Sequence, residues 1–342
     1  MYKVLTLNNI AVEGLRHLPR ERYEVASEIA HPDAILLRSF NMHNWDIPDT
    51  VAAIGRAGAG TNNIPIDAMS ARGVPVFNAP GANANAVKEL VIAGLLLGAR
   101  NLCDAREYVK ALKEKGDALN KAVEAGKKQF VGFELPGKTL GVIGLGAIGV
   151  EVANAALALG MKVIGYDPKI TVRRAWQLSS GVEHAENIDQ LFQHADAVTV
   201  HVPLMDATRN LINRDRLALM PNGGMVINFA RGGVADDEAV LAALDSGKLH
   251  AYVTDFPTKE TKAHPKVVAL PHLGASTTEA EENCAVMVAE NVKDFLENGN
   301  VRHSVNFPES RLGRIDAHRI TIANANVPNM VGQISTCIAD AG

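Results

Sequence analysis

Three residues in the second half of the sequence carry side chains that could share acid–base chemistry, and each follows an apolar run. They are Arg231, Glu260 and His272. A guanidinium can bind a carboxylate at two points and polarise the carbonyl beside it. A histidine can take a hydroxyl proton as hydride leaves, and a carboxylate can hold the imidazole in one tautomer. Together they suit hydride transfer on a 2-hydroxy acid, whereas each alone is equally well explained as a solvated or helix-capping residue.

A glycine-spaced turn in the middle of the chain predicts a dinucleotide site. Gly144, Gly146 and Gly149 lie between a strand-like run at 140–143 and a helix-like run at 147–159. Such glycines permit a tight turn and let the backbone approach a pyrophosphate, which the free N–H groups of the helix start can bind. Ordinary turns share this spacing, so the prediction depends on the flanking strand and helix.

Asp167 indicates which dinucleotide this turn would bind. It ends the next apolar run, 162–166, about 18 residues beyond Gly149. A carboxylate near this spacing accepts hydrogen bonds from the adenosine ribose, and its charge repels a 2′-phosphate. We therefore expect NAD rather than NADP, with a surface aspartate as the alternative explanation.

The composition is that of an ordinary globular protein with no basic surface. The 342 residues are 47% hydrophobic and carry a net charge of −4, so neither nucleic acid nor an anionic membrane is an expected partner. Cys103, Cys284 and Cys337 lie far apart, which argues against a disulfide framework and a zinc site, and we expect no metal. The chain starts with a strand-like segment and contains no long apolar run, so we expect a cytoplasmic location.

Apolar runs alternate with helix-like segments in two series, which predicts an α/β fold with two doubly wound parallel sheets. The first series lies at 3–7, 34–38, 51–56 and 75–78, with helices at 12–18 and 66–71 between its strands. The second series follows the glycine turn at 197–200, 225–228, 251–255 and 267–270.

Two long helix-like stretches join the two series and predict an inserted domain. They cover 87–107, with a charged continuation to about 115, and 277–297. A strand expected at 302–307 would return the chain to the first sheet. The predicted domains are 1–98 with 290–310, then 99–289, and a partial segment at 318–342. Two sequential domains with a loose tail are the alternative.

The last segment, 319–342, predicts one strand, a turn and one helix, which cannot bury a core of their own. We therefore expect that the sequence is a truncated form of a longer protein.

Several of these motifs together resemble the NAD-dependent D-2-hydroxyacid dehydrogenase family over about residues 1–310. They are the glycine turn, the run 228–232, the segment 255–260 and the run 271–277. Within that family, Arg38-Ser39 and the segments 55–67 and 304–308 resemble the D-3-phosphoglycerate dehydrogenase branch. The final segment resembles the opening strand and helix of an ACT regulatory domain. The resemblance implies a Rossmann NAD domain inserted into a flavodoxin-like substrate domain.

The resemblance also implies roles for individual residues. The catalytic residues would be Arg231, Glu260 and His272. The residues near NAD would be Gly144, Gly146, Ala147, Ile148, Gly149, Asp167, Pro203, Thr208, Ala230 and Asp255. Backbone groups at Ala59 and Gly60 would bind the substrate carboxylate, and its phosphate would be bound by Arg38, Ser39 and Arg56.

The implied reaction is the NAD-dependent oxidation of 3-phosphoglycerate to 3-phosphohydroxypyruvate, the first step of serine biosynthesis. Alternatives are a hydroxypyruvate, glyoxylate or branched 2-hydroxy acid dehydrogenase, an NAD-sensing corepressor, and a formate-type dehydrogenase, in which Glu260 would lack a role. The charged helical arm at 106–126 suggests a homodimer or homotetramer, although a solvated helix explains it nearly as well.

Overall fold

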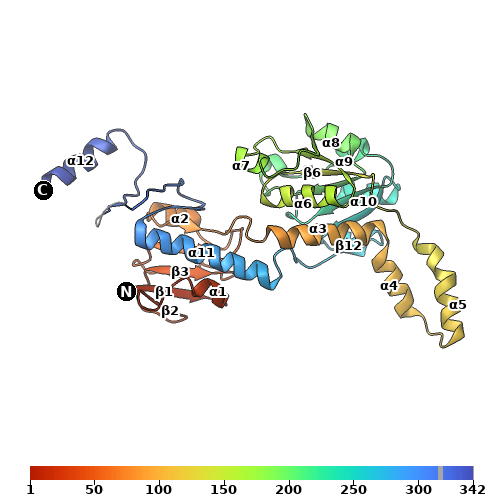
Figure 1. The fold of residues 1–342 in the computed structure, drawn as a ribbon, viewed down its shortest axis with the longest axis horizontal. Coiled ribbons are helices and arrows are strands. Elements are labelled where there is room, and N and C mark those ends of the chain that lie inside the picture. The colour runs from red at the N-terminus through yellow and green to blue at the C-terminus, as the bar shows by residue number, and fades with distance from the viewer. Residues whose placement is uncertain (315–318, 342) are drawn as a thin grey trace. The chain divides into compact units, whose positions relative to one another are not determined.

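The computed structural model describes residues 1–314 and 319–341, which divide into two compact units. The first unit contains Met1–Pro80 and the described residues from Glu281 onward. The second unit is the continuous segment Gly81–Ala280. Figure 1 shows that each unit is built around its own sheet.

In its described residues, the first unit contains a five-stranded parallel sheet in the order β2-β1-β3-β4-β5. Its strands are β1 (Tyr2–Leu7), β2 (Tyr23–Ala26), β3 (Ala34–Leu37), β4 (Ala53–Arg56) and β5 (Val76–Phe77). Its helices are α1 (Val12–Leu15), α2 (Ile66–Ala71), α11 (Thr278–Asn298, which starts in the second unit) and α12 (Met330–Asp340). The order 2-1-3-4-5 is that of a flavodoxin-like sheet.

Helix α11 packs closely against the sheet of the first unit. A Cβ atom on Gly55 of β4 would lie 2.6 Å from Cγ2 of Val288 and 2.9 Å from Cγ2 of Val292, both on α11. This approach needs glycine at position 55, because no side chain fits between strand and helix. Ile35, Leu37 and other fully buried apolar residues of the sheet form a separate core.

The described part of the second unit holds seven parallel strands in the order β12-β11-β10-β9-β6-β7-β8. They are β6 (Thr139–Ile143), β7 (Lys162–Tyr166), β8 (Val182–His184), β9 (Ala197–Val200), β10 (Gly224–Asn228), β11 (Leu249–Thr254) and β12 (Val267–Ala269). Numbered within the unit, the order contains 3-2-1-4-5-6, as in a Rossmann sheet, and it reverses between β6 and β9. Ligands bind outside the carboxyl ends of strands at such a reversal.

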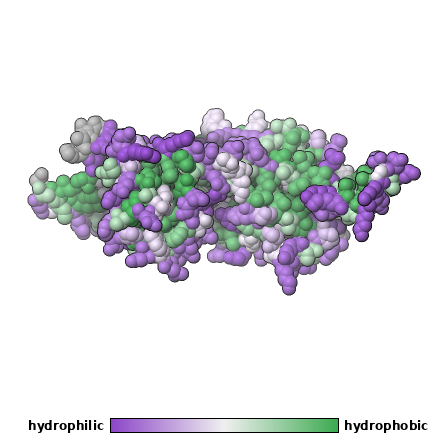
Figure 2. All heavy atoms as spheres, turned by 90° about the horizontal axis from the view of Figure 1, so that it is seen from below, coloured by the Kyte–Doolittle hydropathy of each residue, from purple (hydrophilic) through white to green (hydrophobic). Residues whose placement is uncertain are grey.

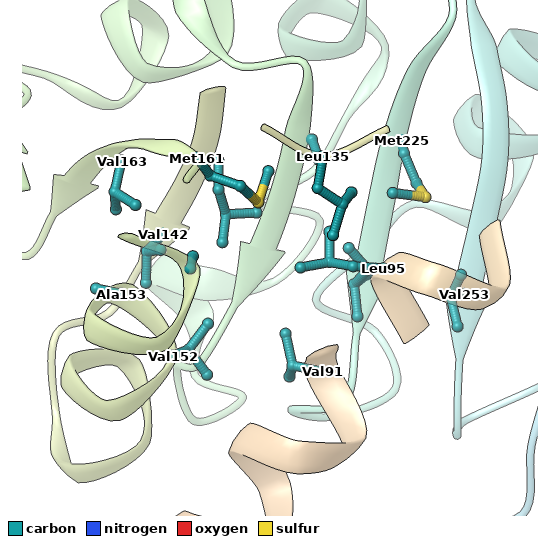
Figure 3. Packing of buried hydrophobic residues seen from close by; sticks show 14 of the residues in the cluster. Val91, Leu95, Leu135, Val142, Val152, Ala153, Met161, Val163, Met225 and Val253 are labelled. Atoms are coloured by element: carbon teal, nitrogen blue, oxygen red, sulfur yellow. The ribbon is translucent and has the colours of Figure 1, made fainter. Parts of the chain in front are cut away.

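The second unit also contains helices, some of which pack against its sheet. They are α3 (Ala84–Ala99), α4 (Leu102–Ala111), α5 (Asp117–Gly126), α6 (Ala147–Ala158), α7 (Val172–Ala175), α8 (Ile188–His194), α9 (Arg214–Leu219) and α10 (Asp237–Asp245), with short 3-10 turns η1 (Lys127–Phe130), η2 (Asp206–Thr208) and η3 (Thr261–Ala263). Figure 3 shows Val91 and Leu95 of α3 in one apolar cluster with Val142 of β6 and Val253 of β11. Val152 of α6 belongs to the same cluster. A second apolar cluster includes residues of α8, α9 and α10.

Helices α4 and α5 form a hairpin, which we call the arm (Figure 1). The Tyr108 hydroxyl donates to the carbonyl of Ala122 at 2.9 Å, and its ring lies 5.4 Å from that of Phe130. No residue of α4 is fully buried.

The predicted fold class is confirmed, with two doubly wound parallel α/β sheets, but the prediction of one helix over 87–107 is wrong. The helix ends at Ala99 and restarts at Leu102, because Asn101 adopts a left-handed conformation with φ of 49°. Asparagine tolerates this conformation, so the break needs neither glycine nor proline. The short strands β2 and β8 were not predicted.

The segment 302–307 returns to the first unit as predicted, but it forms isolated bridges instead of a strand. Ser304 bridges Phe77, and the Asn306 side chain accepts a hydrogen bond from the backbone N–H of Val76 at 2.8 Å. The strand expected after Arg319 is absent over 319–327, because no neighbouring strand pairs with these mostly exposed residues. Positions 318 and 342 of the predicted C-terminal segment lie outside the described residues.

The surface drawn in Figure 2 is largely hydrophilic, with smaller apolar patches between the polar regions. None of the helices within 1–314 and 319–341 has the length and apolar character needed to cross a bilayer.

Candidate active site

The glycine turn is a steric requirement of the backbone between β6 and α6. Gly144 has a φ of 89°, and a Cβ atom there would lie 2.6 Å from the carbonyl oxygen of His201. A Cβ atom on Gly149 would overlap the carbonyl oxygen of Gly144. These two glycines are therefore needed for the fold of the turn itself.

Gly146 is different, because a Cβ atom on it would meet no protein atom within 4 Å. It is the N-cap residue of α6, and no side chain caps the helix. The first N–H groups of a helix lack partners inside it and attract an anion. The open space at Gly146 and the uncapped N–H groups of Ala147, Ile148 and Gly149 thus fit a pyrophosphate at close range.

Asp167 is held beside this turn by two backbone N–H groups. Leu145 donates to Oδ2 at 2.9 Å and Lys169 donates to Oδ1 at 2.8 Å. Each carboxylate oxygen has a further lone pair, so both can still accept from ribose hydroxyl groups. The structure therefore places Asp167 beside the turn, as its predicted role in cofactor binding requires.

Replacing Gly146 or Gly149 by alanine should separate ligand binding from folding. We expect Gly149→Ala to lower the free energy of unfolding by about 1–3 kcal/mol, because the backbone must move to admit the methyl group. We expect Gly146→Ala to leave thermal unfolding unchanged and to weaken NADH binding about tenfold, since the methyl group fills the space of the ligand. Thermal unfolding and NADH fluorescence titration measure the two effects. Undiminished NADH binding by Gly146→Ala would contradict this assignment.

Asp255 follows β11 and presents a buried oxygen without a partner. The residue is 2% exposed, and its Oδ2 accepts from the backbone N–H of Leu273 at 3.2 Å. Its Oδ1 has no hydrogen-bond partner in the described part of the chain. Desolvation raises the pKa of Asp255, opposed by His272 and by the backbone N–H groups of Leu273 and Gly274. A buried acceptor of this kind fits the amide of a nicotinamide.

His272 lies near Asp255, and its side chain is accessible. The residue is exposed, and its ring centroid lies 4.6 Å from that of Phe256. The structure therefore places the imidazole close to the group suited to the nicotinamide amide, where it can exchange protons with a bound molecule.

Arg231 follows β10 on a backbone that Asn228 holds in place. The Asn228 side chain accepts from the N–H of Ala230 at 3.1 Å and donates to the carbonyl of Arg231 at 3.0 Å. The guanidinium is exposed, and one of its N–H groups donates to the carbonyl of Ala230 at 2.7 Å. Among the described residues the guanidinium makes no further hydrogen bond or ion pair, so its other donors can bind a ligand. Sequence reasoning missed Asn228, for which the signal is a polar residue at the end of an apolar strand.

Glu260 belongs to a tight loop, and its contacts differ from those predicted. Thr258 and Thr261 on either side exchange backbone-to-hydroxyl hydrogen bonds of 2.8 and 3.3 Å. The Glu260 charge helps to raise the pKa of Asp237, after the larger effect of desolvation. No hydrogen bond joins Glu260 to His272 within the described residues, so its catalytic role stays a prediction.

Residues after β9 form the remaining part of the predicted nicotinamide surroundings. The Thr208 hydroxyl donates to the carbonyl of Pro203 at 2.6 Å and accepts from the N–H of Met205 at 2.8 Å. Desolvation lowers the pKa of His201 to about 3, so this imidazole is neutral, and its Nε2 lies 3.0 Å from Oγ1 of Thr199. The predicted residues of the second unit thus follow β6, β7, β9, β10, β11 and β12 at their carboxyl ends.

In the first unit, two arginines follow adjacent strands. Arg38 comes directly after β3 and Arg56 ends β4, and Nε of Arg56 donates to the carbonyl of Arg38 at 3.0 Å. The guanidinium of Arg56 lies over Gly58, where a Cβ atom would overlap its Nη1. Nη1 of Arg38 lies 2.6 Å from Oε1 of Glu281 on α11, a partner that sequence reasoning missed.

The other predicted substrate residues lie on neighbouring loops of this unit. Ser39 is exposed and donates its backbone N–H to Asn8 at 3.2 Å. Ala59 accepts a hydrogen bond from the Asn78 side chain at 2.7 Å, and Gly60 is partly exposed. These backbone positions, together with the two arginines, form a region of the first unit that suits an anion.

Comparison with known proteins relates this arrangement to a defined family. Residues 92–274, more than half of the chain, match the family described as D-isomer specific 2-hydroxyacid dehydrogenase, NAD binding domain. A hydroxypyruvate reductase from Thermotoga maritima is 37% identical over 284 residues, covering 80% of this chain and 87% of that protein. The chain belongs to the D-isomer specific 2-hydroxyacid dehydrogenase family.

Two further family members are similar over most of this chain. A D-3-phosphoglycerate dehydrogenase from Methanocaldococcus jannaschii is 37% identical over 329 residues, which cover 93% of this chain. The chain spans only 59% of the length of that relative. The structure of 3-phosphoglycerate dehydrogenase from Entamoeba histolytica with bound NAD+ has a TM-score of 0.68 at 28% identity, covering 90% of this chain and 99% of that one.

NAD is thus the cofactor of this family's binding domain, and the residues of this chain fit it. The space over Gly146 and the uncapped start of α6 suit the pyrophosphate, Asp167 suits the adenosine ribose, and Oδ1 of Asp255 suits the nicotinamide amide. In the ranges 1–314 and 319–341, no group of three or more His, Cys, Asp or Glu residues is placed to hold a metal ion.

Proposed function

We propose that the protein is a D-3-phosphoglycerate dehydrogenase, which oxidises 3-phosphoglycerate to 3-phosphohydroxypyruvate at the start of serine biosynthesis. The observation that carries the proposal is the pair Arg38 and Arg56, on adjacent strand ends of the first unit. Two guanidinium groups suit a phosphate dianion, which the net charge of −4 would otherwise not attract. The Methanocaldococcus and Entamoeba proteins support the same reaction.

In the proposed mechanism, each residue acts on one part of the substrate. Arg231 binds the carboxylate and polarises the adjoining C2 oxygen as it becomes a carbonyl. The imidazole of His272 removes the proton of the C2 hydroxyl, and Glu260 orients the imidazole. Bound NAD supplies the acceptor for the C2 hydride. Ser39 and the two arginines bind the phosphate, and backbone groups at 59–60 also bind the carboxylate.

A panel of D-2-hydroxy acids tests the substrate. We expect kcat/KM for 3-phosphoglycerate to exceed that for D-glycerate, because only the phosphorylated acid uses Arg38 and Arg56. Equal values for the two acids would overturn the assignment.

Replacing Arg38 by alanine should act on the phosphorylated acid alone. We expect KM for 3-phosphoglycerate to rise about tenfold or more with little change in kcat, since the lost hydrogen bonds to phosphate are charge-assisted. The constants for D-glycerate should stay within about twofold, and steady-state assays with both acids measure the difference. Equal losses with both acids would remove Arg38 from the phosphate site.

Hydroxypyruvate reduction is a second candidate. The Thermotoga hydroxypyruvate reductase matches over most of both chains, and the Glu281 carboxylate neutralises part of the charge of Arg38. A preference for hydroxypyruvate over its phosphorylated form would favour this function.

The proposed enzyme acts as a homodimer or homotetramer. The arm supports this, because α4 has no fully buried residue and its apolar Leu102 and Val109 are about half exposed. A second copy of the chain would cover these side chains.

A further inference from the structure

The glycine turn provides no charged side chain for the two negative charges of a pyrophosphate. Residues 144–149 read Gly-Leu-Gly-Ala-Ile-Gly, and the first helical residue of α6 is Ala147. The start of a helix contributes only about half a positive charge. A cationic side chain from another element would complete this part of the cofactor site.

Arg174 of α7 lies next to the start of α6. A Cβ atom on Gly81 would lie 2.7 Å from Cβ of Ala147 and 3.7 Å from Nη2 of Arg174, so the guanidinium is close to the first helical residue. All three residues belong to the second unit. Arg174 is partly buried, whereas Arg173 beside it is exposed.

The position of Arg174 is fixed through α6 itself. Its Nη1 donates to Oε1 of Gln177 at 2.8 Å, and its backbone N–H donates to the Thr171 hydroxyl at 3.3 Å. Asn154 of α6 donates to the carbonyl of Gln177 and accepts from the N–H of Ser179, both at 2.9 Å. The segment that carries Arg174 is therefore tied to the helix whose start binds the ligand.

In the described part of the chain, no acidic side chain forms an ion pair with Arg174. The Asp167 carboxylate accepts from backbone N–H groups of Leu145 and Lys169. A guanidinium has five N–H donors, of which Gln177 uses one. A phosphate group binds well to a guanidinium that has unused N–H donors and a charge without an acidic partner. Arg174 presents both beside the anion site.

We infer that Arg174 binds the pyrophosphate of NAD and supplies the cationic side chain that the glycine turn lacks. The inference rests on the cofactor of the family and not on the proposed substrate. The 2′-phosphate of NADP is the competing ligand for the same guanidinium. Asp167 argues against it, because a carboxylate beside the ribose repels that group.

Binding measurements on Arg174→Gln test this role without any hydroxy acid. We expect the Kd for NADH to rise about tenfold, as for the loss of a hydrogen bond to a charged group. ADP-ribose, which contains the pyrophosphate but no nicotinamide, should lose affinity by a similar factor, and adenosine, which contains no phosphate, should bind unchanged. NADH fluorescence titration and displacement by the other two compounds give these values.

Two further variants make the result specific. Arg173→Gln removes the same charge one residue away and should change the Kd for NADH by less than about twofold. Arg174→Lys keeps the charge but lacks the planar guanidinium, so we expect its loss of NADH affinity to lie between those of the wild type and Arg174→Gln. This variant also keeps the test possible if Arg174→Gln does not fold.

Three results would overturn the inference. They are unchanged NADH binding by Arg174→Gln, equal losses for Arg173→Gln and Arg174→Gln, and a loss confined to NADPH. The last result would assign Arg174 to the 2′-phosphate. Because no substrate is present, failure of the phosphoglycerate proposal would leave this measurement unaffected.

Discussion

Replacing His272 by glutamine should reduce kcat about a thousandfold, as expected when a general base is lost from the reacting hydroxyl. Glutamine preserves the approximate size of the side chain but cannot take up the proton. His272 is exposed, and its ring contacts that of Phe256 at a tilt of 50°, so we expect no comparable loss of stability. Steady-state turnover in both directions of the reaction measures the effect.

Cofactor binding serves as the control for His272→Gln. The Kd for NADH should stay within about threefold of the wild-type value, because the proposed contacts to the cofactor come from Asp255, Asp167, Arg174 and the glycine turn. Turnover within tenfold of the wild type would show that another group moves the proton. The same comparison on Glu260→Gln would test whether that carboxylate orients the imidazole.

Replacing Arg231 should have the second-largest effect. We expect Arg231→Gln to lower kcat/KM by about a thousandfold, since both the carboxylate contact and the charge at the developing carbonyl are lost. Arg231→Lys keeps the charge without the planar fork, and we expect a loss of about a hundredfold. The lysine variant thus separates charge from geometry.

Asn228 holds the backbone on which Arg231 is presented. Its side chain bonds both the N–H of Ala230 and the carbonyl of Arg231, and the residue is 1% exposed.

If lysine at position 231 were as active as arginine, a two-point contact to the carboxylate would be excluded. If the two Arg231 variants bound NADH much more weakly, the arginine would belong to the cofactor site instead.

The glycine turn was predictable because its requirements are local. Gly144 needs glycine for its φ of 89°, and a Cβ atom on Gly149 would overlap the carbonyl oxygen of Gly144 five positions earlier. Asp167 was predictable for a similar reason, because it directly follows β7, the strand that pairs with β6. The spacing of nearby residues in the sequence is therefore enough to predict this part of the site.

The partners of Arg38 and Glu260 were not predictable, since they depend on packing between distant segments. Glu281 lies more than 200 positions from Arg38 in the sequence, and only the seating of α11 on the first sheet brings them together. The charge of Glu260 contributes to raising the pKa of Asp237 of α10, and no spacing rule in the sequence indicates that these two residues are close. The break at Asn101 was missed because a single asparagine in a left-handed conformation resembles any other polar helix residue in sequence.

The return of the chain to the first unit has a consequence for synthesis on the ribosome. The backbone N–H of Val76 can form its hydrogen bond to the Asn306 side chain only after another 230 residues have been synthesised. In the same way, the Tyr2 hydroxyl cannot bind the carbonyl of Leu296 until that residue has been added to the chain. At about 5–20 residues per second, the ribosome needs on the order of ten to sixty seconds to synthesise the chain up to these partners. The continuous segment 81–280 can fold during that time, so the N-terminal sheet, although made first, acquires its last contacts after the segment inserted into it.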